Sequence, residues 1–150
     1  MTNQEAREIA LKVAWSYHGT FYQWGGDDPS GFDCSGLVIE ILKSVGKLPK
    51  KGDWTANGLY EFGYNLGWSY YPYSHKSIEQ IATGRIVFWS DRAGHIYHVE
   101  MALNNELSIG ASGGGSRVKT REDAIKYNAF IKVRPIEGRG GRVLILDPFV

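Results

Sequence analysis

A helix begins within the stretch Gly31-Phe32-Asp33-Cys34-Ser35-Gly36-Leu37, which follows a glycine-rich loop. Asp33 is of a residue type that caps helix N-termini, and apolar residues with helical spacing follow it up to Gly46. We therefore expect Cys34 in the first turn of this helix. Unpaired backbone N–H groups and the helix dipole favour an anion there, which predicts a lowered thiol pKa and a nucleophilic cysteine.

Cys34 is the single cysteine of the chain, so an internal disulfide and a cysteine-based metal site are both excluded. A lone cysteine is most often a small buried apolar residue. Ser35 and Gly36 are small enough to leave the turn accessible, and glycines before the turn let a substrate approach the backbone closely. The position of Cys34 therefore supports a nucleophile as strongly as it supports an inert buried cysteine.

Helical signals dominate the first half of the chain. A capping box at residues 2–5 opens an amphipathic helix whose apolar face includes Ile9 and which Gly19 ends. Shorter helices are expected at residues 55–64 and 120–127.

Strand signals dominate the second half, with β-type runs at residues 85–89, 96–103, 107–111, 129–134 and 143–146. Helices followed by strands indicate an α+β fold, in which N-terminal helices pack on a mostly antiparallel sheet. The chain reads as one domain over residues 1–150. We expect an extra terminal strand at 142–148, which the glycine-rich segment 138–141 would let detach.

Composition excludes several classes of function. Of the 150 residues, 43% are apolar and 22% are charged, as in ordinary soluble domains. The net charge of +1 gives no electrostatic case for nucleic acid or an anionic membrane. Residues 1–15 carry several charged side chains, so we expect neither a signal peptide nor membrane insertion.

A nucleophilic cysteine needs a base, and the chain has four histidines: His18, His75, His95 and His98. His18 lies at a helix end and His75 in a tyrosine-rich loop, where structural or surface roles are common. His95 lies at the mouth of a strand. His98 lies inside the strand expected at 96–103, on one face with Glu100. Because strand-face histidines are more often surface groups, the residues alone leave both roles of His98 open.

Four motifs in one order resemble the NlpC-type cell-wall peptidases, a branch of the papain-like fold. Residues 32–38 resemble the nucleophile motif, and Tyr22-Gln23-Trp24-Gly25-Gly26 resembles its lead-in. Residues 84–89 resemble the central strand, with Arg85 in place of the usual Asp. His98-Val99 followed by Leu103 resembles the base motif, and residues 109–115 resemble the strand and glycine turn after it. The resemblance covers roughly residues 5–118.

The resemblance implies that Cys34 attacks, that His98 activates it, and that Tyr22 helps to hold the oxyanion. The implied substrate-binding residues are Tyr22, Trp24, Asp33 and Ser35. The implied reaction is cleavage of the peptide stems of bacterial peptidoglycan, commonly at the D-glutamyl–diaminopimelate bond, through a Cys-His acyl-enzyme. No metal and no organic cofactor is implied. Asp33 has a second reading, as the cap of the helix that starts at Cys34.

One position departs from the family. A third polar residue, most often His, usually lies twelve positions after the base, where this chain has Gly110. Glu100 shares a strand face with His98 at a backbone separation of about 6.5–7 Å, and we interpret it as the carboxylate that orients the base. The alternatives are that Glu100 is a plain polar residue, or that Ser112 or a backbone carbonyl holds His98.

Residues 54–73 are rich in Trp, Tyr and Gly and have little periodic hydrophobicity. We predict that they wall the substrate groove. The alternative is a satellite core beneath a long loop.

Residues 109–115, together with the charged N-terminus, resemble the phage-encoded branch of the family, whose members are tail-associated wall hydrolases or lysins. That branch implies synthesis in the host cytoplasm, association with phage tail proteins, and action in the cell wall or periplasm. Two other functions stay open. One is an amidase or acyltransferase on the same scaffold, and the other is a non-catalytic wall-binding or tail structural domain, which Gly110 favours.

Overall fold

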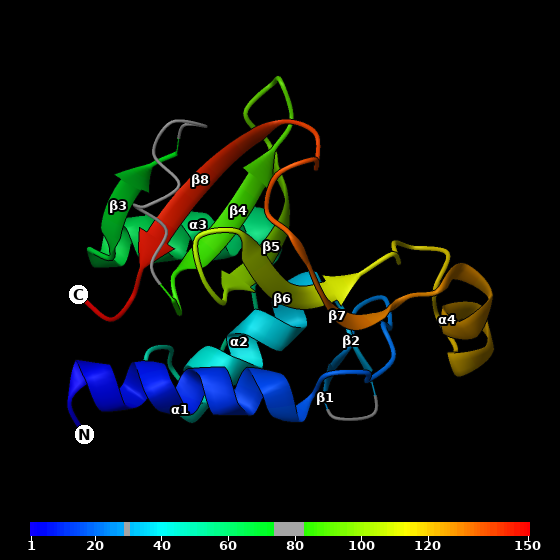
Figure 1. Ribbon diagram of the computed structural model, residues 1–150, viewed down its shortest axis with the longest axis horizontal. Coiled ribbons are helices and arrows are strands. Elements are labelled where there is room, and N and C mark those ends of the chain that lie inside the picture. The colour runs from blue at the N-terminus through cyan, green and yellow to red at the C-terminus, as the bar shows by residue number, and fades with distance from the viewer. Residues whose placement is uncertain (29–30, 74–82) are drawn as a thin grey trace.

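The computed structural model describes residues 1–28, 31–73 and 83–150, and in these ranges helices come mostly first and strands mostly last (Figure 1). The helices are α1 (Asn3–Ser16), α2 (Cys34–Ser44), α3 (Ala56–Leu66) and α4 (Arg121–Tyr127). The strands are β1 (Asp27–Asp28), β2 (Gly31–Phe32), β3 (Ser69–Pro72), β4 (Ile86–Ser90), β5 (Ile96–Ala102), β6 (Leu107–Ser112), β7 (Phe130–Pro135) and β8 (Arg142–Asp147).

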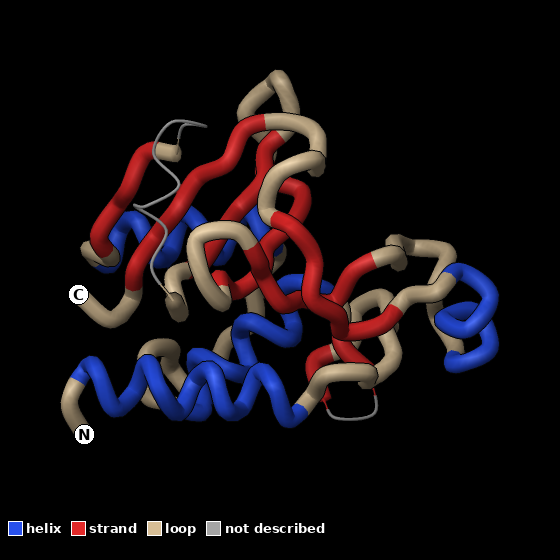
Figure 2. The backbone as a smooth tube through the Cα atoms, viewed as in Figure 1, coloured by secondary structure: helices blue, strands red, loops and turns tan. Residues whose placement is uncertain are grey.

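Six strands form one sheet in the order β3-β8-β4-β5-β6-β7, and each neighbouring pair is antiparallel (Figures 1 and 2). β1 and β2 form a separate two-stranded hairpin before α2. The expected α+β fold with an antiparallel sheet is confirmed.

The N-terminus of α1 is fixed by hydrogen bonds between its first residues. The Thr2 hydroxyl accepts from the Glu5 N–H at 3.1 Å, and the Glu5 carboxylate accepts from the Thr2 N–H at 2.6 Å, which completes the capping box. The buried side of α1 consists of alanines, which let this helix approach α2 closely, whereas Ile9 is exposed. The apolar face expected around Ile9 is therefore rotated toward the alanines.

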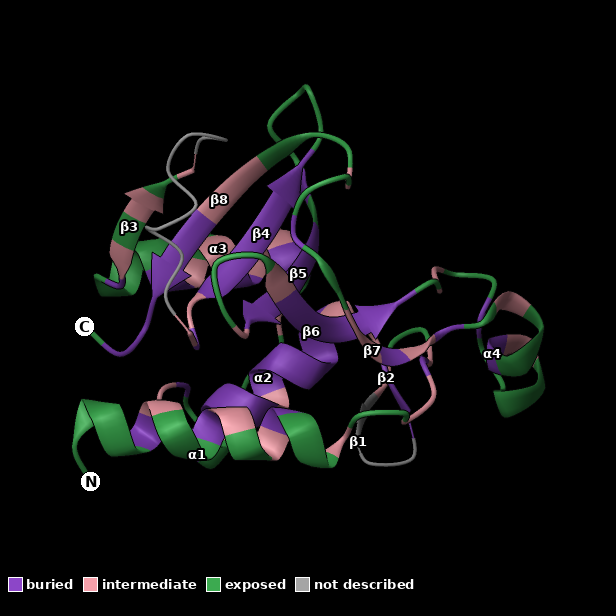
Figure 3. Ribbon diagram, in the orientation of Figure 1, coloured by how far each residue is buried: buried purple, intermediate pink, exposed green. Residues whose placement is uncertain are grey.

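One face of the sheet is covered by α2 and α3, which pack against β5. Figure 3 shows α2 almost wholly buried between α1 and the sheet, while the outer side of α1 is exposed. Burying both sides of α2 requires the nearly continuous apolar run Leu37–Leu42, interrupted by Glu40. The N-terminal end of α2, where Cys34 lies, is thereby fixed against β5.

The opposite face of the sheet carries a second apolar cluster, made of Val87, Trp89, Ala102, Ile136 and Ile145. Part of its cover comes from the segment that joins β7 to β8. A Cβ on Gly141 would lie 1.8 Å from the Ser90 carbonyl oxygen, and its φ is +95°, so this segment approaches β4 only because position 141 is glycine.

The strand expected at 142–148 is β8, and it does not detach. It lies inside the sheet between β3 and β4. Its last residue, Asp147, is fully buried and accepts from Arg7 of α1 at 3.1 Å and from Arg85 at 3.0 Å. Arg85, which stands where the family usually has Asp, therefore ties β4 to β8 and stacks on Tyr71.

Two elements were not expected. The hairpin of β1 and β2 lies within the predicted loop, and β3 lies within the aromatic stretch 54–73. β3 becomes a strand by pairing with β8, far away in sequence, so its local sequence carries little signal for it. In the described ranges, no helix has the length and apolar character needed to cross a membrane.

Candidate active site

Cys34 lies in the first turn of α2 and lines a cleft of about 650 Å³. The same cleft is lined by Tyr22, Trp24, Asp33 and Ser35. The predicted nucleophile and the predicted substrate-binding residues are therefore brought together around one hollow, although only the helix start was visible from local sequence.

The Cys34 thiol does not have the lowered pKa that its helix position suggested. Burial raises the pKa of Cys34 to about 12, and the charge of Asp33 acts in the same direction. The backbone N–H groups of Val99 and Ser35 act against these two influences and are outweighed. The expectation fails because the sulfur is desolvated and because Gly36, whose first-turn N–H could have faced an anion, donates to Asp33 instead.

Asp33 ties the glycine loop to the start of α2. Its Oδ1 accepts from the Gly36 N–H at 2.7 Å and from the Ser35 hydroxyl at 3.3 Å. Its Oδ2 accepts from the Gly25 N–H at 3.2 Å. Burial raises the pKa of Asp33 despite these hydrogen bonds. Both carboxylate oxygens are thus engaged within the protein, as the capping interpretation requires.

Tyr22 lies beside the thiol and is only 5% exposed. A Cβ on Gly114 would lie 2.2 Å from the Tyr22 ring, so the glycine turn after β6 packs directly on this side chain. Burial, with the neighbouring Cys34 acting in the same direction, raises the pKa of Tyr22 to about 12. The phenol therefore keeps its proton at neutral pH and can donate it in a hydrogen bond.

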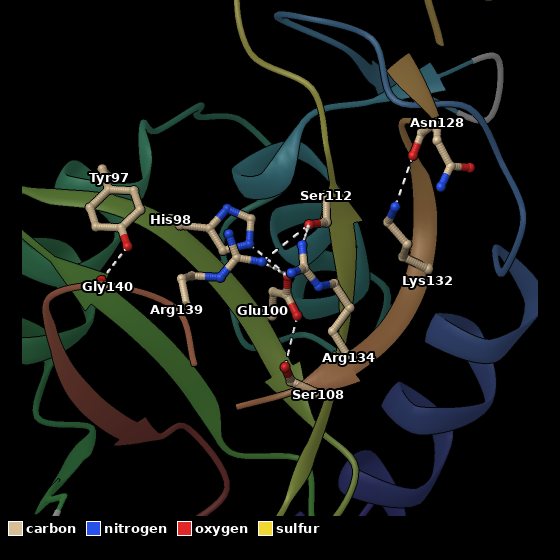
Figure 4. Close-up of polar contacts among 10 residues, drawn as sticks. All are labelled: Tyr97, His98, Glu100, Ser108, Ser112, Asn128, Lys132, Arg134, Arg139 and Gly140. Atoms are coloured by element: carbon tan, nitrogen blue, oxygen red, sulfur yellow. Dashed lines mark hydrogen bonds and ion pairs between the residues drawn. The ribbon is translucent and has the colours of Figure 1, made fainter. Parts of the chain in front are cut away.

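His98 and Glu100 are in contact on β5. His98 Nε2 lies 2.6 Å from Glu100 Oε2, and both side chains are buried, at 8% and 1% exposure (Figure 4). The Ser108 hydroxyl donates to Glu100 Oε1 at 2.7 Å. Arg139 Nη2 lies 3.3 Å from Glu100 Oε2. The carboxylate is therefore surrounded by donors.

These contacts fix the protonation states of the pair. Burial acts to raise the pKa of Glu100, but the hydrogen bonds from His98 and Ser108 and the positive charge of Arg139 leave that pKa below its ordinary value. Burial lowers the pKa of His98, and although Glu100 acts to raise it, the net shift is downward. At neutral pH a neutral imidazole therefore donates from Nε2 to an ionised carboxylate, and its Nδ1 is an acceptor.

Gly110 and Glu100 occupy one space. Gly110 is on β6, and a Cβ there would lie 2.3 Å from Glu100 Cγ. Position 110, where the resemblance leads us to expect a third polar residue, has no side chain. The Glu100 side chain of β5 fills the space that such a side chain would take. The absence of a side chain at Gly110 therefore leaves room for the carboxylate of Glu100.

The two histidines of this region have different surroundings. The N–H of the peptide that joins His98 to Val99 faces the Cys34 sulfur, so the thiol lies against β5 next to His98. Trp89 packs beside the His98 ring, with 5.4 Å between ring centroids. His95 is exposed in the turn before β5, lines the cleft, and bonds Asp91 through its backbone. His98 alone of the two is held by a buried carboxylate.

A model of the NlpC/P60 family matches residues 19–134. The chain belongs to the NlpC/P60 family. Among curated NlpC/P60 relatives, Protein P54 of Enterococcus faecium is 36% identical over 107 residues, which are 71% of this chain. The probable peptidoglycan endopeptidase LytE of Bacillus subtilis is 30% identical over 105 residues, or 68% of this chain. The chain spans only 18% and 26% of the lengths of these two relatives.

Solved structures agree with this NlpC/P60 membership. The NlpC/p60 domain of the peptidoglycan hydrolase SagA superposes with a TM-score of 0.63 at 26% identity, over 93% of this chain and 97% of that one. The peptidoglycan hydrolase RipB of Mycobacterium tuberculosis gives a TM-score of 0.69 at 22% identity, over 97% of this chain and 66% of that one. The latter likeness concerns the fold alone.

Several polar residues of this NlpC/P60 site were not found from the sequence. They are Ser108 on β6 and Arg139 between β7 and β8, which contact Glu100, and Arg134 on β7, which bonds Ser112. Ser112, named from the sequence as an alternative holder of His98, bonds Arg134 and Arg139. Ser108 could have been inferred from strand pairing, because it pairs with Ala102 beside Glu100. Arg139 lies among glycines in a segment expected to be flexible, so no local pattern pointed to it.

The aromatic stretch 54–73 walls the cleft only at its beginning. Trp54 lines the cleft and packs on Phe62, whereas Tyr60 packs edge-on against Phe88 of β4. Tyr70 lines a separate hollow of about 280 Å³ beside β8. The prediction for the stretch as a whole is wrong, because α3 and β3 use its aromatic residues for packing. His75 lies outside the described residues.

The described part of the chain contains no group of three or more His, Cys, Asp or Glu side chains placed to hold a metal ion.

Proposed function

We propose that this chain is a cysteine endopeptidase that cleaves the peptide stems of bacterial peptidoglycan. The main support is the buried His98–Glu100 pair, which lies on the strand that faces the Cys34 thiol. Family relatives that include LytE and RipB are described as peptidoglycan endopeptidases or hydrolases, which gives the substrate class.

The proposed reaction starts from a neutral thiol and a neutral imidazole, because the pKa of Cys34 is raised and that of His98 is lowered. A preformed thiolate–imidazolium pair is disfavoured by the same shifts. The Cys34 proton therefore passes to His98 Nδ1 as the sulfur attacks the scissile carbonyl carbon. Glu100 stabilises the imidazolium that forms, since its carboxylate accepts from Nε2 at 2.6 Å.

The Tyr22 hydroxyl is the proposed donor to the oxyanion of the tetrahedral intermediate. When this intermediate collapses, the C–N bond breaks and His98 returns its proton to the leaving amine. The acyl group stays on Cys34 as a thioester. A water molecule then gives a proton to His98 and attacks the thioester carbonyl. The C–S bond breaks, His98 passes the proton to the leaving Cys34 sulfur, and the acid product departs as its carboxylate, which restores the thiol and the neutral imidazole.

The bond within the stem is a finer part of the proposal. We assign it to the D-glutamyl–diaminopimelate linkage, which the family resemblance implies. The phage-associated setting rests on the resemblance of residues 109–115 to the phage-encoded branch of the family. Gly114 of this segment also packs on Tyr22, so association with a virion tail depends on resemblance. Mass spectrometry of purified virions tests that setting.

Digestion of purified cell walls tests the reaction. We expect the wild-type protein to release muropeptides with a free D-glutamyl carboxylate and a new diaminopimelyl amine, identified by mass spectrometry. Cys34→Ala and His98→Ala should lower the rate by several powers of ten, whereas His95→Ala should keep the turnover number. Wild-type rates for Cys34→Ala would refute the proposal.

The same digestion separates the other functions. Cleavage between glycan and stem would identify an amidase, and a new amide bond on added amines would identify an acyltransferase. Wall binding without any product would identify a non-catalytic domain. Slow thiol labelling does not indicate such a domain, because burial keeps the Cys34 thiol protonated even beside an intact His98–Glu100 pair.

A further inference from the structure

Arg139 contacts the His98–Glu100 pair from the segment between β7 and β8. Its Nη2 lies 3.3 Å from Glu100 Oε2 and 3.1 Å from the Ser112 hydroxyl oxygen (Figure 4). Its guanidinium also lies over the Trp89 ring, 5.2 Å from the centroid, and Trp89 packs beside His98. Arg139 therefore touches both of the groups that enclose the imidazole.

One carboxylate oxygen connects the two contacts. Glu100 Oε2 accepts from His98 Nε2 and from Arg139 Nη2, while Oε1 accepts from Ser108. The direction of the Oε2 lone pairs is thus set jointly by the imidazole and the guanidinium. Moving the guanidinium would let the carboxylate rotate away from the imidazole.

We propose that Arg139 is a positioning residue for the reaction, which holds the carboxylate of Glu100 ionised and aimed at His98. This inference rests on the proposed function, since it concerns the same dyad.

The use of a carboxylate, Glu100, to hold His98 explains why a positive charge is needed beside the pair. The residue that usually orients the base in this family is a histidine, which can serve as a neutral group. Glu100 does the same task with a charge, and it is 1% exposed. A buried carboxylate without a counter-charge takes up a proton. Arg139 is the counter-charge in direct contact with it, at 20% exposure of its side chain.

Other titratable groups face the pair from β7 and α2. Arg134 on β7 donates to the Ser112 hydroxyl at 3.0 Å, and Lys132 on β7 donates to the Asn128 carbonyl at 2.8 Å. Cys34 on α2 faces Glu100 as a neutral thiol. Arg134 and Arg139 share the Ser112 hydroxyl, and the positive charge of Arg134, like that of Arg139, acts to lower the pKa of His98.

The segment that carries Arg139 is anchored on both sides. The Ile136 N–H donates to the Glu106 carbonyl at 2.8 Å, and the Tyr97 hydroxyl donates to the Gly140 carbonyl. Gly141, the residue after Gly140, is held by its close approach to the Ser90 carbonyl oxygen. The guanidinium is therefore placed before substrate arrives, as a positioning residue requires.

Arg139→Gln tests the proposal in two ways. Because hydrogen bonds to charged groups are strong, we expect kcat to fall by about tenfold to a hundredfold with KM nearly unchanged. Removing the positive charge should raise the pKa of His98, so the acidic limb of kcat/KM should move to higher pH. The same upward shift should appear in an NMR pH titration of the His98 ring, which needs no catalysis.

Arg139→Lys and Arg142→Gln are the matched variants. Arg139→Lys keeps the charge but not the planar fork, so it should keep the wild-type His98 titration and recover part of kcat. Arg142→Gln removes an exposed charge three residues away and should resemble wild type.

The outcomes separate this inference from the proposed function. If the wild-type protein hydrolyses no peptidoglycan, the proposed function is wrong, and the His98 titration still decides whether Arg139 acts on the pair. An unchanged titration together with an unchanged kcat in Arg139→Gln overturns the inference. If Arg139→Gln does not fold, a wild-type kcat in Arg139→Lys overturns the requirement for a guanidinium.

Discussion

Glu100 is the charged residue in hydrogen-bond contact with His98. Its negative charge acts to raise the pKa of His98, while burial and the nearby arginines lower it. The net result is an imidazole that is neutral at neutral pH and still oriented through Nε2. The acidic limb of activity should therefore lie below the ordinary pKa of histidine, because His98 loses its function as a base only when it becomes protonated.

Glu100→Gln should leave the fold intact and lower kcat by between about 10²- and 10⁴-fold, as for other residues that orient a catalytic histidine. Because a negative charge is removed, the pKa of His98 should fall and the acidic limb should move to lower pH. This shift is opposite in sign to that expected for Arg139→Gln. Initial rates from pH 4 to 8 locate the acidic limb of each of the two variants. Full activity of Glu100→Gln would mean that another group holds His98.

At the scale of elements, β5 and β6 together shape the surroundings of the Glu100 carboxylate. Their pairing places Gly110 against the Glu100 side chain, so the polar group can come from one strand only if the other leaves room. Gly110→Ala should displace the carboxylate, lower kcat by tenfold or more and destabilise the fold by about 1–3 kcal/mol. Kinetics and urea unfolding measure the two effects.

Gly140→Ala is the matched control, because a Cβ there meets open space. The reverse exchange, Glu100→Gly with Gly110→His, should recover more activity than either single change. If the double variant is no better than Gly110→His alone, the two positions do not share one function.

Elements that depend on residues close in sequence could be predicted, whereas strands that depend on distant partners could not. Helix starts were visible because Thr2, Asp33 and Thr120 make caps within three or four residues. β3 was missed because its partner β8 lies far along the chain. The sign of the Cys34 pKa shift was also missed, since burial depends on how β5 and the cleft close over α2.

The candidate site divides in the same way. Cys34, Tyr22 and His98 belong to short motifs with recognisable spacing, and Glu100 follows from strand period. Arg139 belongs to no pattern, because it reaches Glu100 across 39 residues of sequence through tertiary packing.

At the scale of the whole molecule, Asp147 joins three parts of the chain. It is fully buried and pairs with Arg7 of α1 and with Arg85 beside β4. Asp147→Ala would leave two largely buried guanidinium groups without their carboxylate. We expect a loss of about 3 kcal/mol in the free energy of unfolding and a drop of about 10 °C in Tm.

Urea unfolding and a thermal melt of Asp147→Ala provide the measurement. Glu122→Ala, which removes an exposed carboxylate from the first turn of α4, should change the free energy of unfolding by only a few tenths of a kcal/mol. Equal stability of the two variants would show that Asp147 is not a structural anchor.

The place of β8 between β3 and β4 has a consequence for the order of folding. β4, β5, β6 and β7 pair mostly with neighbours in sequence, whereas β8 pairs with β3 and β4, which lie far before it in the chain. Closing such loops is slow. The part of the sheet formed by β4, β5, β6 and β7 should therefore form early, with His98 and Glu100 already adjacent. β8 should join the sheet later. Arg139 reaches its position with β8, so the chain gains its complete charge network only in the final step of folding.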